Sequence, residues 1–325
     1  MPYAYWPRSG LDRVYPRSRV TDLIVATPVF LDLTFVGLES LPALGEERFA
    51  GSLLRSPGGG AITAVAAARL GLSTAVAAPL GDDVSGDLVR AALAEEQVEV
   101  ISRNPASRTP TTVVLPFGGD RAMVTVDPGV RASSADVAAR PARAVSTNLE
   151  MLSVVPPEAH AYVTCGDDDA RAFKGHPPAA LAGSRALFVN RDEALALTGK
   201  ATVEQAAADL GELAETVVVT LAGDGALMAT GGEIFATKAE RVEKPVDTTG
   251  AGDLLAAAYI WADLRGAEPV DRLRWAVVYA SLSVTTPTGI GGALDEDGLL
   301  QAGTARGLSA PPHVGAARGS TDADV

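Results

Sequence analysis

The chain of 325 residues contains a single cysteine, Cys165. One thiol cannot form an internal disulfide, and such sparse use of cysteine is typical of a reducing compartment. Positive charge is also scarce: 27 Lys and Arg face 40 Asp and Glu, which gives a net charge of −13. Since nucleic acid and anionic membranes bind basic surfaces, we expect neither as the main partner.

Long apolar runs are absent as well. No stretch approaches the ~20 residues that a membrane span needs. Several arginines precede the apolar stretch 23–33, loosely as in a signal peptide, but Asp22 lies beside it and Pro28 interrupts it. We therefore predict a cytoplasmic protein, in which residues 1–20 form a polar extension and residues 310–325 a disordered tail.

Several motifs that define large enzyme classes are missing. The one Gly-Lys pair, Gly199-Lys200, lacks the context of a Walker A loop, and no G-x-G-x-x-G opens a helix after the first strand. H-E-x-x-H, C-x-x-C and G-x-S-x-G do not occur, and the histidines (His160, His176, His313) are isolated. The sequence therefore lacks the motifs that usually indicate P-loop NTPases, NAD dehydrogenases, zinc hydrolases or serine hydrolases.

The sequence does contain a glycine turn, DTTGAGD, that runs directly into an apolar helix. Gly250 and Gly252 allow backbone conformations that a side chain would forbid, and amides at a helix start point where an anion can bind. Asp253 lies in the first helical turn, beside those amides. An acid next to an anion site suits phosphoryl transfer, because the acid removes a proton and the amides hold the developing charge. The alternative is that Asp253 only complements the helix dipole.

Short apolar strands alternate with helices along most of the chain. We expect the strands at 23–30, 73–78, 161–164, 186–189 and 216–220, with helices at 60–70, 88–96, 194–197, 203–213, 251–264 and 270–285 and a hairpin at 226–237. This alternation predicts an α/β fold over residues 21–309, with a doubly wound, mostly parallel sheet flanked by helices. Strands at 33–36, 47–54, 111–117 and 121–126 lack intervening helices. They predict a small β-sheet lid, formed from about 33–54 and 111–126.

Four segments occur in the order PGGGAITAVAAARLGL, PLGDDVSGD, FVNRDEALALTG and DTTGAGD. Together they resemble the PfkB/ribokinase family of carbohydrate kinases over residues 23–300. The resemblance implies a ribokinase-like fold and an enzyme that moves the γ-phosphate of ATP to an alcohol of a sugar or sugar-like substrate. It implies that Asp253 is the general base and that the amides of Gly250, Ala251 and Gly252 form the anion hole. A nucleoside kinase of the same family and a non-catalytic sugar- or nucleotide-binding protein are the alternatives.

The same resemblance implies residues for the nucleotide and its metal. Asn190 and Glu193 match an N-x-x-E motif that acts through Mg²⁺, and the alternative is that Asn190 caps the following helix with Glu193 completing a capping box. Both roles can hold together. Thr220 and Gly225 fall on a T-x-G-x-x-G segment that contacts ATP phosphate, with Ala222 in place of one glycine.

For the substrate, the resemblance implies Asp32 as a partner of sugar hydroxyls and Gly58 and Gly59 as a turn close against the sugar. The chain departs from the family at Ile62, where an asparagine is usual, followed by Thr63. Loss of that polar contact leaves the identity of the substrate open.

Further features are weaker. Asp247 and Thr249, with the loop 287–292, resemble a monovalent-cation site, which suggests K⁺. Arg121 on the GGDR hairpin can reach the site if the substrate is anionic, although an exposed arginine is more often solvated. Lids often pair between subunits in this family, and an exposed sheet has sticky edges, so we predict a homodimer through the lid.

Overall fold

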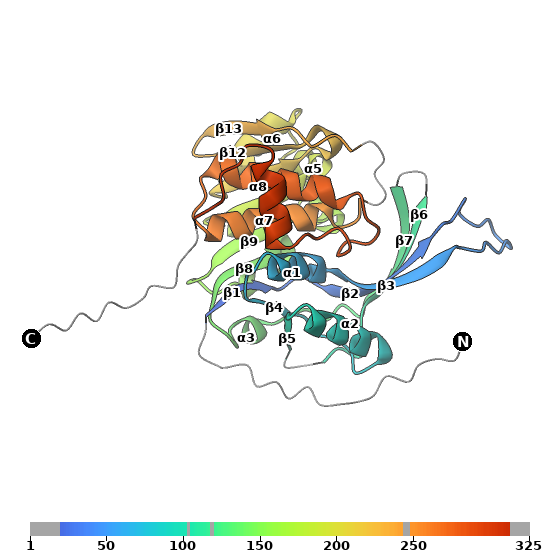
Figure 1. Ribbon diagram of the computed structural model, residues 1–325. Helices are drawn as coiled ribbons and strands as arrows, with labels where there is room; N and C mark the ends of the chain where they lie inside the picture. The colour runs from blue at the N-terminus through green and yellow to red at the C-terminus, as the bar shows by residue number, and fades with distance from the viewer. Residues whose placement is uncertain (1–19, 103–104, 118–119, 243–247, 313–325) are drawn as a thin grey trace, which may run out of the picture.

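The computed structural model describes residues 20–102, 105–117, 120–242 and 248–312. Its main body is a nine-stranded sheet with helices on both faces, and a four-stranded sheet projects from one side of that body (Figure 1). The predicted fold class is confirmed: an α/β protein with a large, mostly parallel sheet and a smaller separate sheet. The predicted N-terminal extension and C-terminal tail lie almost entirely outside the described residues.

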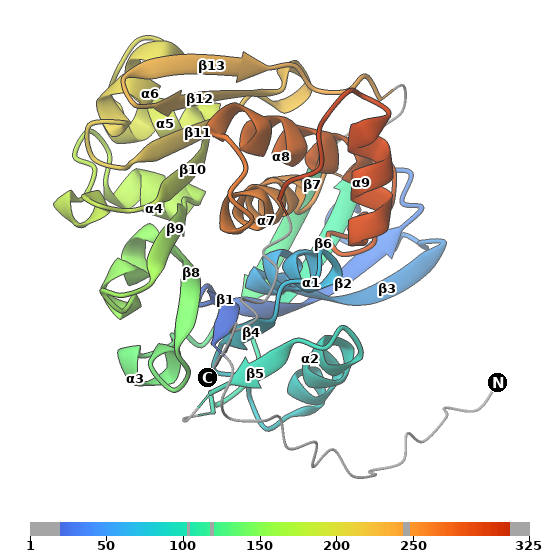
Figure 2. The same cartoon turned by 60° about the vertical axis from the view of Figure 1, so that its left-hand side comes forward.

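The main sheet has the strand order β13-β12-β11-β10-β9-β8-β1-β4-β5, and Figure 2 shows it from β5 at the bottom to β13 at the top. Its strands are β1 (Thr21–Val25), β4 (Thr74–Ala77), β5 (Glu99–Ile101), β8 (Ala142–Asn148), β9 (His160–Thr164), β10 (Ala186–Asn190), β11 (Thr216–Thr220), β12 (Ala226–Thr230) and β13 (Glu233–Thr237). Neighbours from β5 to β11 are parallel, and β12 and β13 add an antiparallel hairpin. The chain winds first to one side of β1 and then to the other, so the order reverses between β1 and β8. In such sheets ligands bind outside the carboxyl ends of the strands at this switch point.

The strands read as continuous apolar runs because both faces of the sheet are covered. In β1, Leu23 and Val25 belong to the core on one face, whereas Ile24 belongs to the core on the other. The first core lies under the helices α1 (Gly60–Arg69), α2 (Val84–Glu95), α7 (Ala251–Leu264), α8 (Pro269–Ser283) and α9 (Glu296–Thr304). The helices that follow the remaining strands are α3 (Ser134–Val137), α4 (Asp167–Ala172), α5 (Arg191–Thr198) and α6 (Val203–Leu210), with short 3₁₀ turns at Leu149–Val154, Ala179–Leu181 and Ala222–Asp224. No helix in the described part of the chain has both the length and the apolar character to cross a membrane.

The lid has the strand order β3-β2-β6-β7, with β2 (Val29–Val36), β3 (Ser52–Gly59), β6 (Thr111–Phe117) and β7 (Asp120–Val126). The prediction of one strand over residues 23–30 is wrong, because β1 ends at Val25 and β2 begins at Val29. Proline has no amide hydrogen for a strand ladder, so Pro28 separates the two. The strand predicted at 47–54 lies later, at Ser52–Gly59, and Asp32 lies inside β2.

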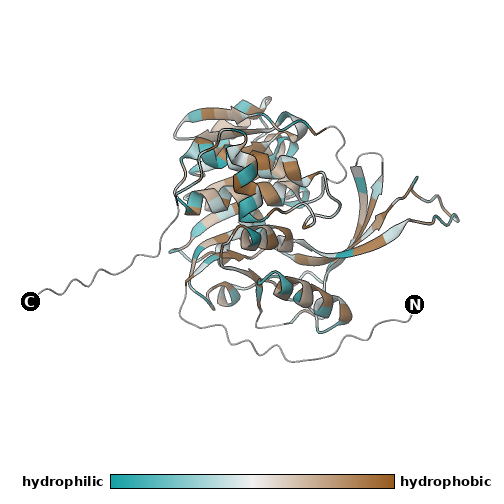
Figure 3. Cartoon of the chain, viewed as in Figure 1, coloured by the Kyte–Doolittle hydropathy of each residue, from teal (hydrophilic) through white to brown (hydrophobic). Residues whose placement is uncertain are grey.

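The lid exposes apolar side chains. Phe49, Met123, Val124 and Val126 are 85%, 54%, 66% and 52% exposed. Figure 3 shows hydrophobic segments on the strands that project from the body. A surface of this kind on an extended sheet favours association with another apolar surface.

Candidate active site

The start of α7 lies at the edge of the main sheet where the strands end. Its N-cap, Gly250, has φ 76°, a left-handed conformation that glycine adopts without strain. A Cβ atom at Gly250 would lie 3.0 Å from Cα of Gly289 and 3.0 Å from Cδ1 of Ile62, so space also requires glycine. The Ala251 amide donates to the Thr248 carbonyl at 3.3 Å. The next amides of the first turn have no partner within a helix, which is the general reason that helix starts bind anions.

The carboxyl group of Asp253 receives a hydrogen bond from a residue that the sequence motifs did not single out. The Thr63 hydroxyl in α1 donates to Asp253 Oδ1 at 3.1 Å. Burial raises the pKa of Asp253 to about 6, although the Thr63 hydrogen bond, its own amide and the charge of Arg121 act to lower it. A carboxylate with a pKa near the working pH is well suited to accept a proton.

The base of the lid brings the predicted substrate residues together. Asp32 lies inside β2, opposite Ser56 of β3 and Thr112 of β6. A Cβ at Gly58 would overlap the Asp32 carboxyl group, so this carboxyl lies directly against the glycine. Gly59 has φ 59° and is the N-cap of α1. Close packing of a carboxylate on a bare backbone therefore explains why glycine is needed at position 58.

Arg121 extends from β7 of the lid to the turn before α7. Its Nη1 atom donates to Thr248 Oγ1 at 3.4 Å, and its charge acts on Asp253. The hairpin arginine thus reaches the candidate site, where its charge would suit an anionic substrate.

The predicted nucleotide residues lie at the carboxyl ends of the neighbouring strands β10 and β11, where Asn190 is opposite Thr220. Asn190 caps α5: its side chain accepts from the Glu193 amide at 2.9 Å, and Glu193 Oε2 accepts from the Asn190 amide at 2.7 Å. Burial raises the pKa of Glu193 to about 7. Ala222 has φ 51°, which is unusual for a residue with a side chain, and Gly225 has φ 102°. This left-handed alanine stands where the resembling family has glycine.

Glu193 also affects the one cysteine. Cys165 follows β9, and burial, together with the negative charge of Glu193, raises the pKa of its thiol. Burial thus raises the pKa of Asp253, Glu193 and Cys165 alike.

The loop that resembles a cation site packs against the same glycine turn. A Cβ at Gly289 would overlap Ile62, which is only 3% exposed, so Ile62 fills the space between this loop and Gly250. Arg69 of α1 holds the loop, because its Nη1 donates to the carbonyls of Ile290 and Ala293 at 2.9 and 2.7 Å. Asp247 lies outside the described residues. Thr249 lies in the turn before Gly250.

Within the described ranges, no group of three or more His, Cys, Asp or Glu side chains is placed to hold a metal ion. This fits a Mg²⁺ ion that takes one or two protein groups and otherwise binds water and phosphate oxygens. The capping box uses one oxygen of Asn190 and one of Glu193, and amide and carboxylate oxygens retain further acceptor capacity.

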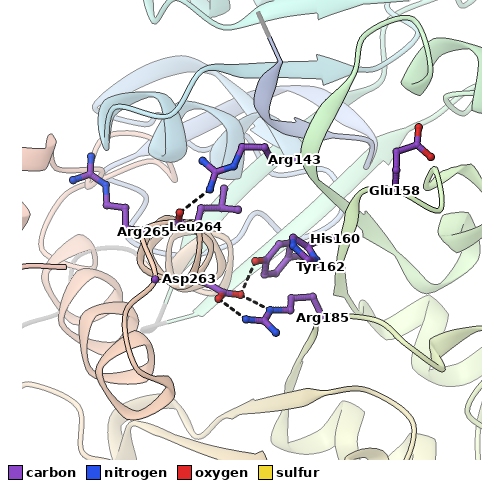
Figure 4. A pocket seen from close by; sticks show the side chains of 9 residues that line it. Arg143, Glu158, His160, Tyr162, Arg185, Asp263, Leu264 and Arg265 are labelled. Atoms are coloured by element: carbon purple, nitrogen blue, oxygen red, sulfur yellow. Dashed lines mark hydrogen bonds and ion pairs between the residues drawn. The ribbon is translucent and has the colours of Figure 1, made fainter. Parts of the chain in front are cut away.

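A hollow lies at the opposite end of α7, where the strands begin (Figure 4). Asp263 accepts from Tyr162 at 2.6 Å and from Nε and Nη2 of Arg185 at 2.8 Å each. Arg143 donates to the Leu264 carbonyl at 2.7 Å. Arg185 and Tyr162 of this pocket are thus bound to Asp263, and Arg143 is bound to the end of the helix. None of the predicted site residues lines the pocket.

Comparison with known proteins identifies the family. The model of the pfkB family carbohydrate kinases matches residues 45–296, well over half of the chain. The chain belongs to this family. The resemblance drawn from its motifs is confirmed, and this pfkB-family chain is an enzyme, a carbohydrate kinase.

Individual relatives match almost their whole length. Acarbose 7(IV)-phosphotransferase of Actinoplanes sp. is 28% identical over 306 residues, which cover 87% of this chain and 99% of the relative. Ribokinase of Bacillus subtilis is 29% identical over 260 residues, 75% of this chain and 86% of the relative. These names support phosphorylation of sugars in general.

Solved structures of kinases also match this chain. Arabidopsis thaliana ribokinase, complexed with ribose and ATP, matches with a TM-score of 0.70 at 25% identity and covers 87% of this chain and 99% of its own. Phosphofructokinase-2 from Escherichia coli matches with a TM-score of 0.74 at 19% identity. The match covers 90% of this pfkB-family chain and 100% of the phosphofructokinase chain, and it shows that the two share a fold.

Proposed function

We propose that this kinase transfers the γ-phosphate of ATP to an alcohol group of a sugar or sugar-like substrate, with Asp253 as the general base. The observation that carries the proposal is the position of Asp253 in the first turn of α7, beside the glycine N-cap and with a pKa of about 6. The carboxylate takes the proton of the substrate hydroxyl. The hydroxyl oxygen then attacks the γ-phosphorus, and ADP leaves.

Charge that develops on the transferring phosphoryl group is held by the backbone at residues 250–252. Gly250 sets the direction of this turn through its left-handed φ, and Gly252 leaves open space beside the helix start. A helix N-terminus with unpaired amides supplies an anion site without a Walker loop.

We propose that ATP lies along the carboxyl ends of β10 and β11, against Thr220 and Gly225. Asn190 and Glu193 would hold Mg²⁺ there, and that ion would neutralise phosphate charge. The loop 287–292, with Asp247 and Thr249, is our proposed site for K⁺. Support for ATP comes from the Arabidopsis ribokinase structure, which is complexed with ribose and ATP.

Asp32 is our proposed partner of the substrate hydroxyls, with Gly58 and Gly59 beside it. A carboxylate can accept hydrogen bonds from two hydroxyls of one diol. Two relatives carry names that refer to acarbose and ribose. A neutral saccharide is therefore the first class of substrate to test.

The proposal is tested by ADP release with Mg²⁺ and ATP across a panel of sugars, sugar phosphates, acarbose and nucleosides, in Na⁺ and in K⁺ buffer. We expect substrate-dependent ADP release with at least one saccharide. ADP release with nucleosides alone would mean that the substrate is a nucleoside and not a sugar. The absence of ADP release with every alcohol tested would contradict the transfer reaction.

Asp253→Asn tests the base. This variant keeps the shape of the side chain and should bind ATP normally, while turnover should fall by ~100-fold or more because the proton acceptor is lost. Turnover close to that of the unmodified enzyme would remove Asp253 from the role of base.

A further inference from the structure

Thr63 is unusual for its position. Helix α1 buries every residue from Gly60 to Ala67, and Thr63 is the one polar side chain among them, at 2% exposure. A valine would fill the same volume without a hydroxyl that needs a hydrogen-bond partner. The hydroxyl has such a partner in Asp253, 190 residues away in the sequence.

The contact is made possible by the packing of α1 against α7 (Figure 2). Ile62, the neighbour of Thr63, packs on Gly250 and Gly289. The first turn of α1 therefore contacts both parts of the candidate site: Ile62 lies against the glycine turn, and Thr63 holds the carboxyl group.

We propose that Thr63 is a positioning residue, whose hydroxyl fixes Oδ1 of Asp253 and thereby leaves Oδ2 to accept the proton of the substrate alcohol. This inference rests on the proposed role of Asp253. In the step itself, the alcohol O–H bond breaks as the bond from oxygen to the γ-phosphorus forms, the bond from that phosphorus to ADP breaks, and the proton on Oδ2 later passes to water.

Two groups besides the amide of Asp253 itself act on its carboxyl: the hydroxyl of Thr63 from α1 and the charge of Arg121 from β7. Both favour the ionised form. Removal of the Thr63 donor alone should therefore raise the pKa of the base while Arg121 remains in place.

The experiment compares the pH dependence of kcat/KM for the unmodified enzyme, Thr63→Val and Thr63→Ser. We expect the acidic limb of the unmodified enzyme near pH 6. Thr63→Val should move this limb to higher pH by about one unit, because the free energy of a hydrogen bond to a charged group corresponds to a pKa shift of about that size. The KM for ATP should stay unchanged. Thr63→Ser should restore the original limb, because serine keeps the hydroxyl.

Thr74→Val is the matched control. Thr74 is also buried, at 6% exposure, and its hydroxyl donates to the Leu72 carbonyl at 3.0 Å, at the start of β4. Its loss removes a buried hydrogen bond of similar kind but should leave the pH profile unmoved. Thr63→Ala supplies the second donor-free variant if Thr63→Val does not fold, and the same upward shift is expected.

The outcomes separate the two proposals. A folded Thr63→Val or Thr63→Ala enzyme with an unmoved acidic limb overturns the role of Thr63, even where Asp253→Asn is inactive. An active Asp253→Asn enzyme overturns the role of Asp253 itself. A merely structural role for Thr63 would lower the yield of active enzyme equally at every pH.

Discussion

Burial of Asp253 has opposite effects on proton transfer and on folding. The raised pKa suits a base, but it also means that the folded protein carries a charged group in a poorly solvated place. The folded pKa is about 6 and the ordinary value is 3.8. Between these pH values the folded state binds more protons than the unfolded state, so stability falls as pH rises from about 4 to 6.

Asp253→Asn should therefore stabilise the protein at neutral pH. We expect a gain of about 3 kcal/mol in the free energy of unfolding at pH 8 and only about 0.5 kcal/mol at pH 4, where the folded carboxyl group is protonated and the unfolded one is only partly ionised. Urea unfolding at the two pH values measures the difference. An equal gain at both would mean that the charge of Asp253 is not the cause.

Sequence motifs place Asp253, Gly250 and Gly252 in one predicted site because these residues are neighbours in the chain. They did not locate Thr63 as the partner of Asp253, since that contact depends on how α1 packs on α7. Nor did they show that Ile62 is a packing residue at the glycine turn. A single polar residue in the otherwise apolar run GAITAVAAA was the available signal.

At the level of elements, α7 is held at its far end by an ion-pair cluster. The Asp263 side chain is 4% exposed and pairs with Arg185 and with Arg272, both at 2.8–2.9 Å. Burial alone would raise the pKa of Asp263, but hydrogen bonds from Arg185 and Tyr162 and the charge of Arg272 hold it below its ordinary value. This cluster fixes α7 against β9, the start of β10, and α8.

Asp263→Ala should destabilise the fold by about 3 kcal/mol or more, because it removes the buried carboxylate that Arg185, Arg272 and the buried Tyr162 hydroxyl share. Asp271→Ala is the control: its pair with Arg274 on α8 is 38% and 41% exposed, and we expect a change of about 0.5 kcal/mol or less. Denaturant unfolding compares the two. Equal losses would show that the buried cluster adds no special stability.

The sequence predicted most of the parallel strands, since continuous apolar runs indicate strands buried on both faces. It did not predict β8 at the centre of the sheet, because ARAVSTN mixes polar and apolar residues. Ser146 and Thr147 in that strand are nevertheless buried, at 1% and 0% exposure. Helix α9 also went unpredicted, although Asp295 caps it. Its two glycines, at 298 and 303, obscure the helical pattern.

On the scale of the whole molecule, the lid stands apart from the body and presents apolar side chains to solvent. We propose that a second copy of the chain covers this surface. Phe49 and Val124, at 85% and 66% exposure, are strongly exposed apolar side chains on two different parts of the lid.

Light scattering at micromolar concentration should give the mass of a dimer, and Phe49→Ser with Val124→Lys should give a monomer with an unchanged circular dichroism spectrum. Replacement of the exposed pair Asp168→Ser and Arg171→Ser on α4, far from the lid in sequence, should leave the dimer intact. A monomeric unmodified protein would contradict the proposal.

The lone cysteine has a practical consequence for work on the lid. The thiolate is the form that reacts with maleimides and iodoacetamides, and the raised pKa of Cys165 makes this form scarce at neutral pH. In a single chain, Val124→Cys would place an exposed thiol on the lid that reacts far faster, whereas in the proposed dimer the second copy would cover it. One substitution therefore provides a site for a fluorescent label on the lid, with the native thiol left in place, and the rate of labelling reports whether a second copy covers the lid.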